Sequence, residues 1–416
     1  MTKDVMVNDR EYSWPKVPVV VICCDGCEPD YIKTARGEGL MPNLDRIIAD
    51  GSYCEAESVI PSFTNPNNLS IVTGRPPVVH GISGNFFRDR DTGNDVMMND
   101  PKYLRAPTIF SAFQQAGAKV AVVTAKDKLR TLLGHGLSFG DGLAVCLSSE
   151  KADQCTMAEN GIEGVVDLVG MPVPEVYSLE LSEFVFAAGV KLMEVMRPDL
   201  MYLTTTDYIQ HKFAPGTDGA NAFYSMLDRY LGLLDNSGAV VVLTADHGMK
   251  AKHLTNGEPD VIYLQDELDS WFGKDRASVI LPITDPYVIH HGALGSFATV
   301  YLEQDIDVDD VIRRIRELPG IHVVVDGKSG CATYELPEDR LGDVIVISRD
   351  TKVIGTRKTD HDLSALKEPL RSHGGITEQV VPMVVNRPLV GAPSRLRNFD
   401  AFALGLNHSA STKKQS

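Results

Sequence analysis

The sequence has no long apolar segment. None of its apolar runs approaches the roughly 20 residues that a membrane-spanning helix needs, and residues 1–18 lack the apolar stretch of a secretory leader. Basic residues are also scarce, with 40 Lys and Arg against 56 Asp and Glu, which gives a formal charge of −16. A chain of this charge repels nucleic acid and anionic membranes. We therefore expect a cytoplasmic protein that binds neither.

Cysteines are few and irregularly spaced. The seven do not form the framework of a small disulfide-stapled domain, so reduced thiols are expected. Cys24 and Cys27 form one C-x-x-C pair, but no second pair follows at the spacing of a zinc site. Since Cys23 and Cys24 end an apolar, strand-like run, burial accounts for them better than metal binding does.

Apolar residues are abundant and follow a clear pattern. They make up 43% of the 416 residues, enough for one large core and a smaller domain. Short runs rich in Val, Ile and Leu alternate with longer amphipathic stretches, which is typical of an α/β fold with a mostly parallel central sheet flanked by helices. The clearest runs are residues 17–24, 118–125, 199–205, 239–245 and 380–385.

The pattern changes between residues 253 and 365. Shorter strand-like pieces surround a polar, helix-like segment at 307–320, which indicates a smaller α+β cap domain. We expect this cap to be inserted into a catalytic core made of residues 1–252 and 366–416. The polar end of the chain, from 409 onward, is expected to be disordered.

Polar residues follow four of the apolar runs, at the point where each run ends. They are Asp25, Lys126, Asp207 and Asp246. In open α/β sheets the ligand crevice lies outside the carboxyl ends of the strands. The topology therefore predicts that these four distant positions meet at one site.

Three clusters offer carboxylate and imidazole groups, the ligands that zinc prefers. Asp207 and His211 share one face if a helical turn follows the strand, although an exposed helix pair would have the same spacing. Asp246 and His247 are adjacent at a strand end, where a simple turn is the alternative. His373 precedes two glycines, and a lone histidine is more often structural. Together with Asp25, the clusters predict two ligand sets around two metal ions about 4 Å apart.

Thr64 is the best candidate for a nucleophile. It follows a predicted strand at 56–60, and we expect Asn65 to cap a helix whose first residue is Pro66. The free N–H groups of that helix would then face a phosphoryl oxygen beside Thr64, and metal coordination would favour its alkoxide. Thr64 could instead only help to cap the helix, and other hydroxyls in this stretch compete with it: Ser62, Ser70 and Thr73.

Six segments resemble, in this order, the motifs of the alkaline phosphatase superfamily: CCDGCEPDYI, the Thr64 segment, VHGISGNFF, TTDYIQH, TADHGM and SHGG. The nearest resemblance is to the branch that contains nucleotide pyrophosphatases/phosphodiesterases and, above all, phosphonoacetate hydrolases. It implies that Asp207, His211 and His373 hold one zinc ion. It implies that Asp25, Asp246 and His247 hold the other, together with Thr64.

The resemblance also implies a substrate. Lys126 and Lys128 look like the groups that bind the carboxylate and the phosphonate of phosphonoacetate, with their i, i+2 spacing directing them to one side of an extended segment. Asn85 resembles the superfamily asparagine that donates to a phosphoryl oxygen, and His211 also contacts substrate. The expected reaction cleaves the carbon–phosphorus bond through a phosphothreonine at Thr64. Solvated surface lysines and an asparagine in a glycine-rich turn are the plainer alternatives.

Two other functions fit the same residues. A nucleotide pyrophosphatase/phosphodiesterase would use the same metals and Thr64 and would need an aromatic slot, to which Tyr208, Phe86 and Phe87 could contribute. A phosphonate-binding protein without turnover would be expected to lack a ligand or the nucleophile, and no such loss is visible. In the cap, His290 and His291 could reach over the site, but a structural role accounts for them better. A homodimer is expected only from the frequency of such assemblies.

Overall fold

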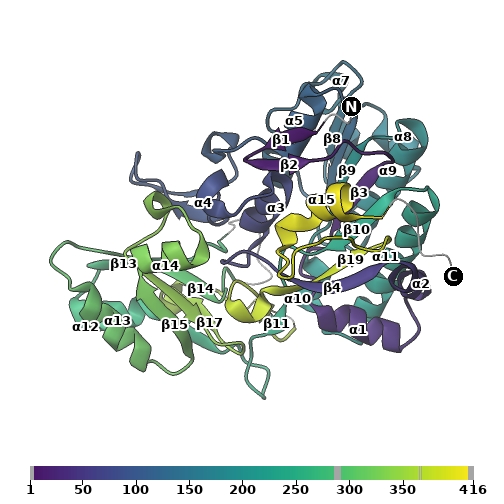
Figure 1. The fold of residues 1–416 in the computed structure, drawn as a ribbon. Coiled ribbons are helices and arrows are strands. Elements are labelled where there is room, and N and C mark those ends of the chain that lie inside the picture. The colour runs from purple at the N-terminus through teal and green to yellow at the C-terminus, as the bar shows by residue number, and fades with distance from the viewer. Residues whose placement is uncertain (1–3, 285–291, 365, 367, 411–416) are drawn as a thin grey trace.

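The computed structural model describes residues 4–284, 292–364, 366 and 368–410. Figure 1 shows a larger region, which holds the first and last described elements, and a smaller region beside it formed by elements from β12 (Val261–Tyr263) to β17 (Val353–Gly355). His290, His291 and the last six residues lie outside the described part of the chain. None of its helices is long and apolar enough to cross a membrane.

The larger region is built on a seven-stranded sheet in the order β4-β19-β10-β3-β9-β7-β8. Five neighbouring strands are parallel and buried along their whole length, as expected for a sheet covered on both faces. The predicted α/β class with a mostly parallel sheet is therefore confirmed. These five strands are β3 (Val19–Cys23), β7 (Val120–Thr124), β8 (Ala144–Ser148), β9 (Leu200–Thr204) and β10 (Val240–Thr244).

The edge beyond β10 differs from the prediction. The run at 380–385 is a strand, β19 (Val380–Val385), but it runs antiparallel to β10. The strand expected at 56–60 is β4 (Ser52–Glu57), which ends earlier because the chain leaves the sheet at Val59. The Val59 N–H binds the side-chain oxygen of Asn67 at 2.7 Å instead of a neighbouring strand.

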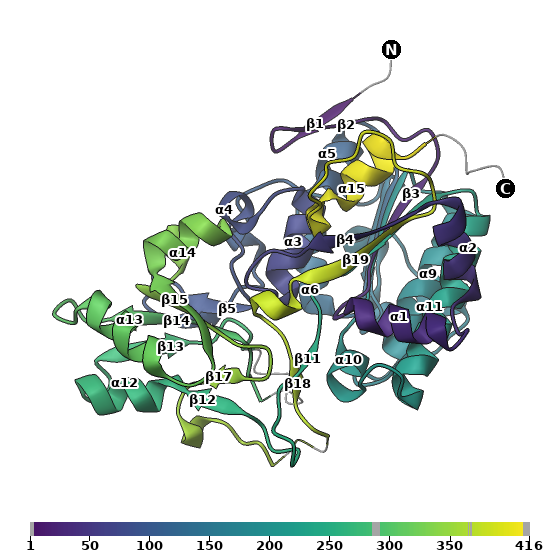
Figure 2. The same cartoon turned by 60° about the horizontal axis from the view of Figure 1, so that its bottom comes forward.

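Helices cover both faces of this sheet (Figure 2). One face packs against α1 (Pro29–Gly37), α2 (Pro42–Asp50), α9 (Glu180–Val195) and α11 (Asp218–Asn236). The other packs against α3 (Thr64–Thr73), α5 (Ile109–Gln115), α6 (Asp127–Leu133) and α15 (Ala401–Ala403). Helix α3 has almost no exposed side and is buried from Pro66 to Thr73, so polar residues on it must find partners inside the protein.

The smaller region has a sheet of its own in the order β13-β14-β16-β15, with all three pairings antiparallel. Its apolar cluster also takes in Ile60 and Phe63 from the segment before α3, so the two regions share packing. The cap boundaries at 253 and 365 stay a prediction. The elements are β13 (Ala277–Ile280), β14 (Phe297–Leu302), β15 (Ile321–Asp326), β16 (Val344–Ser348), α12 (Leu264–Phe272), α13 (Val308–Glu317) and α14 (Gly327–Tyr334).

The chain passes between the regions at a short two-stranded ladder. Strand β11 (Lys250–Ala251), which follows β10, pairs antiparallel with β18 (Arg371–Ser372), which precedes β19. His373 comes directly after β18, so this ladder places it beside the end of β10. The remaining short elements include β1 (Val5–Val7), β2 (Arg10–Tyr12), α4 (Pro77–His80), β5 (Phe86–Arg88), β6 (Asp95–Met97), α7 (Met157–Asn160), α8 (Val165–Val169) and α10 (Tyr208–Lys212).

Candidate functional site

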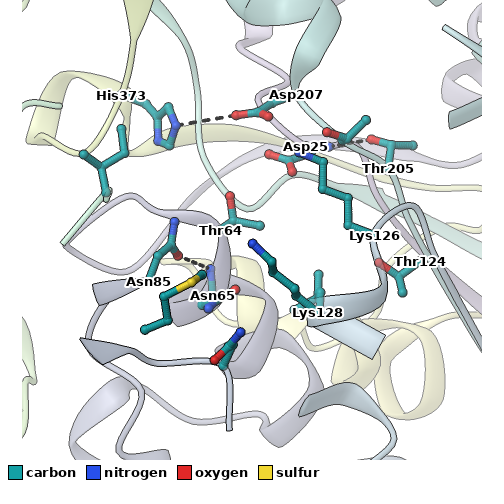
Figure 3. Close-up of a pocket in the computed structure, with 15 residues that line it drawn as sticks. Asp25, Thr64, Asn65, Asn85, Thr124, Lys126, Lys128, Thr205, Asp207 and His373 are labelled. Atoms are coloured by element: carbon teal, nitrogen blue, oxygen red, sulfur yellow. Dashed lines mark hydrogen bonds and ion pairs between the residues drawn. The ribbon is translucent and has the colours of Figure 1, made fainter. Parts of the chain in front are cut away.

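A polar pocket lies outside the carboxyl ends of β3, β7 and β9 (Figure 3). Three of the four strand-end residues, Asp25, Lys126 and Asp207, line it, whereas Asp246 is not among the described lining residues. Its volume is about 90 Å³. The described lining residues are Asp25, Thr64, Asn65, Asn85, Met97, Asn99, Thr124, Lys126, Lys128, Leu129, Thr205, Thr206, Asp207, Ile283 and His373.

Two histidines lie close to the carboxylate of Asp207. This residue precedes α10, whose single turn brings His211 back onto it, with 2.9 Å between Asp207 Oδ2 and His211 Nε2. His373 approaches the same carboxylate oxygen from the loop after β18, at 3.5 Å from its Nε2. The ligand atoms of these three buried residues all lie within 4.8 Å of one another, so the group could hold a metal ion.

A second group surrounds His247. Its Nε2 lies 3.3 Å from Asp25 Oδ1 and 3.7 Å from Asp246 Oδ2. The compact set within 4.8 Å is Asp25, Asp207 and His247, so Asp207 belongs to both groups and Asp246 lies alongside. The His247 and His373 rings are stacked 3.6 Å apart, which joins the two groups into one cluster.

All three histidines are oriented in the same way. Nδ1 of His211, His247 and His373 lies 2.7–2.9 Å from the backbone oxygens of Arg371, Gly248 and Ser62, respectively. Because a carbonyl can only accept, each Nδ1 carries the hydrogen, and in the neutral ring Nε2 keeps its lone pair. The lone pairs then face the carboxylates, which is the arrangement of metal-ligating histidines.

Burial and mutual repulsion shape the charges of this cluster. Burial, with repulsion from Asp207 and Asp246, raises the pKa of Asp25 well above its usual value. Burial raises the pKa of Asp207 too, but its hydrogen bond and electrostatic interaction with His211, followed by the interactions with His373 and His247, bring that pKa well below the usual value. Burial and the neighbouring imidazoles lower the pKa of His373, which keeps it neutral. A cluster rich in carboxylates with a neutral imidazole is suited to a cation.

Two buried atoms test whether metal ions fit. Asp25 Oδ1 and His247 Nε2 have no hydrogen-bond partner among the described residues, although buried polar atoms are normally paired. An ion between a carboxylate oxygen and an imidazole nitrogen would satisfy both. The oxygen and nitrogen donors suit zinc and other first-row divalent metals, so the residues fit the predicted ions.

Thr64 is placed differently from the prediction in one respect. Helix α3 begins at Thr64 and not at Pro66, because Phe63 is its extended N-terminal cap residue. Pro66 is tolerated in the first turn, where its missing N–H costs no helical bond. The Asn65 N–H is bound to the side-chain oxygen of Asn85 at 3.1 Å. The Asn67 N–H is bound to the Phe63 carbonyl, so the Thr64 N–H, which was not among the expected donors, is the one left available in this turn among the described residues.

Asn85 is held so that its amide can donate. Its side-chain oxygen accepts the Asn65 N–H, and its backbone binds the Pro282 carbonyl at 2.8 Å and the Met98 N–H at 2.7 Å. With the oxygen occupied, the amide NH₂ is the part left to meet a ligand in the pocket that Asn85 lines with Thr64. Figure 3 shows Asn85 and the Thr64 hydroxyl on the same side of the pocket.

The two lysines reach the pocket by a different route from the one predicted. Helix α6 begins at Asp127, so Lys126 is extended while Lys128 lies in the first helical turn. A strand-to-helix turn, and not an extended i, i+2 spacing, brings both to the pocket. Lys126 is close enough to oppose the raised pKa of Asp25. Figure 3 shows both lysines opposite His373, with Thr64 between them.

Some supporting residues were not anticipated. The Thr205 hydroxyl accepts the Asp25 N–H at 2.9 Å, which fixes the residue after β3. Asn68 contacts both Thr64 and Asp246 from inside α3. A polar residue in the middle of an otherwise buried helix is the one sequence signal that could have pointed to Asn68.

Comparison with known protein families gives a match over most of the chain. Residues 19–376 match the family model of the type I phosphodiesterases / nucleotide pyrophosphatases. Among curated proteins, the chain is 25% identical to a venom phosphodiesterase of Macrovipera lebetinus and 37% identical to an uncharacterized pyrophosphatase/phosphodiesterase of Schizosaccharomyces pombe. Each match covers 56% of this chain but only 26% and 44% of those relatives, so the chain spans less than half of their length.

A solved structure matches over the whole length. Phosphonoacetate hydrolase from Sinorhizobium meliloti 1021 is 60% identical, and the match covers 99% of this chain and 100% of that one with a TM-score of 0.96. That enzyme has been solved in complex with phosphonoacetate and with phosphonoformate.

Proposed function

Since this chain belongs to the type I phosphodiesterase / nucleotide pyrophosphatase family of the alkaline phosphatase superfamily, we propose that it hydrolyses phosphonoacetate to acetate and phosphate. The family consists of metal-dependent hydrolases. The observation that carries the proposal is one pocket lined by two lysines, by Thr64 and by part of the carboxylate–imidazole cluster. The whole-chain likeness to a phosphonoacetate hydrolase supports it.

The size and charge of the pocket favour a small, doubly charged acid. Its volume of about 90 Å³ is far below the roughly 300–1,000 Å³ of pockets for drug-sized ligands. Phosphonoacetate carries a phosphonate at one end and a carboxylate at the other, so its two anionic groups need cations at two places. We assign the metal cluster to the phosphonate and the lysines to the carboxylate and the remaining phosphonate charge.

The proposed metal sites use the residues that the sequence indicated. Asp207, His211 and His373 would hold one zinc ion, and Asp25, Asp246 and His247 would hold the other with Thr64; Asp207 also belongs to the compact group around His247. When bound, the two ions would lower the pKa of the Thr64 hydroxyl and offset negative charge on the phosphoryl oxygens.

The reaction then follows from the side chains. Thr64 Oγ1 attacks phosphorus in line with the carbon, so that a P–O bond forms as the P–C bond breaks. The electron pair of that bond passes to the methylene carbon and is delocalised into the adjacent carboxylate as an enolate-like dianion. Lys126 and Lys128 stabilise this charge, and the Asn85 amide and the Thr64 N–H donate to phosphoryl oxygens.

A protonation and a hydrolysis complete the cycle. The carbanion takes a proton from water and leaves as acetate, and the hydroxide that remains combines with the proton that Thr64 Oγ1 lost. Water then cleaves the phosphothreonine, which releases phosphate and restores Thr64. In sum, phosphonoacetate and one water give acetate and phosphate. Zinc as the metal, a cytoplasmic location and a homodimer belong to this proposal as predictions.

A nucleotide pyrophosphatase/phosphodiesterase is the second candidate, favoured by the family match and the curated relatives. The aromatic slot it would need is not found among the described lining residues. Phe87 is buried against Tyr103, with ring centroids 5.0 Å apart, and neither Phe86 nor Tyr208 lines the pocket.

A substrate comparison separates the two candidates. We expect kcat/KM to be far higher for phosphonoacetate than for a nucleotide diester. Lys126→Ala should lower the turnover of phosphonoacetate at least roughly 100-fold, because the carbanion loses a stabilising cation. The turnover of an activated aryl phosphate ester should fall by less than about tenfold. Lys191→Ala, an exposed lysine on α9, is the matched control. Preference for the diester, or equal losses on both substrates, would overturn the proposal.

A further inference from the structure

The side chain of Asn68 joins two parts of the site that are far apart in the sequence. It lies in the second turn of α3 and has no exposed surface. Its Nδ2 donates to the Thr64 carbonyl at 3.0 Å and to Asp246 Oδ2 at 3.2 Å. One amide group therefore ties the backbone of the nucleophile to a carboxylate that follows β10.

The orientation of this amide is fixed from the opposite side. Its Oδ1 accepts hydrogen bonds from the Tyr202 hydroxyl at 2.8 Å and the Thr204 hydroxyl at 2.9 Å, both on β9. A flipped amide would place its oxygen against the Thr64 carbonyl and the Asp246 carboxylate, which cannot donate. All four hydrogen-bonding positions of Asn68 are thus used, in a single orientation.

Asn68 supplies one of the three hydrogen bonds that the described residues donate to the Asp246 carboxylate, the one to Oδ2. Asp246 Oδ1 accepts the backbone N–H groups of Gly26 at 3.2 Å and His247 at 3.0 Å, and Oδ2 accepts the amide of Asn68. The two N–H bonds of a planar amide diverge by about 120°, so they hold the Thr64 carbonyl and Asp246 Oδ2 roughly 5 Å apart. Rotation of the Asp246 carboxylate or a shift of α3 would break one of these bonds.

We propose that Asn68 is a positioning residue that keeps Thr64 in register with the metal group around His247. The effect of Asn68 on catalysis rests on the proposed function. Its support of Asp246 can be tested by metal binding alone. The Asn68 side chain touches neither Oγ1 of Thr64 nor the pocket, so it acts through the backbone of one residue and the carboxylate of another.

The test measures metal affinity as well as turnover. For the zinc-loaded chain and its Asn68→Ala variant, the dissociation constants of the two ions are determined by competition with a chelator. We expect the dissociation constant of one ion to rise about 10- to 100-fold, which is the usual effect of removing a residue that supports a metal ligand. The dissociation constant of the other ion should change by less than about threefold. With phosphonoacetate, kcat should fall in the same range while KM changes little.

Asn160→Ala is the matched control, since Asn160 is a buried amide that donates to the Cys146 carbonyl at 2.9 Å on the far edge of the sheet. It should lower stability and leave both ions unchanged. Should Asn68→Ala not fold, the Tyr202→Phe/Thr204→Val double variant keeps the amide but frees its orientation. That variant should weaken the same ion about three- to tenfold.

The outcomes are distinct. Equal weakening of both ions, or no weakening with kcat retained, would overturn the role of Asn68. Selective weakening of one ion in a chain that does not turn over phosphonoacetate would support the positioning of Asp246 and overturn the proposed function alone.

Discussion

The two halves of the carboxylate–imidazole cluster are positioned by different parts of the fold. Asp25 and His247 come just after the parallel strands β3 and β10, whose ladder and covering helices fix them. His211 and His373 lie on α10 and after β18, and their rings are oriented by carbonyls of distant segments, Arg371 O and Ser62 O, whereas the His247 ring is oriented by the neighbouring Gly248 carbonyl. The first half is part of the sheet, whereas the second depends on the segment by which the chain returns from the smaller region.

A buried ion pair links that returning segment to the smaller region. Lys252 Nζ lies 2.8 Å from Glu378 Oε1 and 2.6 Å from the Asp350 carbonyl, and neither charged side chain is exposed. Glu378 Oε2 in turn accepts the Gly375 N–H, two residues after His373. The position of His373 is therefore coupled to the smaller region, whereas His247 follows the central sheet and meets this segment through one backbone bond, from the Gly248 N–H to the Glu378 carbonyl at 2.7 Å.

Asp207 is the residue the two halves share, so its loss should have the largest effect. Asp207→Asn is expected to abolish binding of both ions and to lower kcat/KM by more than about 10⁴-fold, because several kcal/mol of transition-state stabilisation disappear with each ion. Metal content and phosphate release check this. Asp199→Asn, at the opposite end of β9, should keep both ions; a metal-replete Asp207→Asn protein would contradict the shared role.

Removing one histidine from each half sharpens the comparison. His247→Ala should keep the ion at Asp207, His211 and His373, and His373→Ala should keep the ion near Asp25. Each is expected to lower kcat/KM by about 10²- to 10³-fold, less than the loss of both ions. Metal-to-protein ratios near one in both variants support two separable groups. A ratio near zero in either would show that the cluster binds its ions only as a unit.

Breaking the Lys252–Glu378 ion pair should affect activity least and should mainly lower stability. Lys252→Met leaves Glu378 buried without its partner and should lower the free energy of unfolding by about 3–5 kcal/mol, measured by urea denaturation. Lys191→Met, which removes an exposed pair with Glu194, should cost about 1 kcal/mol or less.

The same variant tests the coupling between Lys252 and the His373 half. In Lys252→Met the binding of the ion near His373 should weaken about 10-fold, and the binding of the ion near His247 should change little. Chelator competition distinguishes the two. Equal weakening would argue against a separate dependence of the His373 half on the returning segment.

The strand-end half was the more predictable from the sequence. Parallel strands align their carboxyl ends, so apolar runs followed by polar residues were enough to predict a crevice, and Asp25, Lys126 and Asp207 line it. The helical spacing of Asp207 and His211 is likewise local, and α10 provides it.

What could not be predicted depends on distant contacts. The start of α3 at Thr64 is set by the extended Phe63, and the Asn65 N–H is taken by Asn85, 20 residues away. Asn68 and Asp246 are separated by 178 residues, and Lys252 and Glu378 by 126. No local pattern records such pairs, just as none gave the antiparallel direction of β19.

The most direct test of the proposed reaction follows ³¹P and ¹H signals of phosphonoacetate incubated with the zinc-loaded chain and with its Thr64→Ala variant. The proposal predicts that the phosphonate signal is replaced by phosphate, with one acetate formed for each phosphate, and that Thr64→Ala abolishes the conversion. An unchanged phosphonate signal, from a metal-replete chain that cleaves a nucleotide diester through Thr64, would contradict it and assign the chain to the phosphodiesterases.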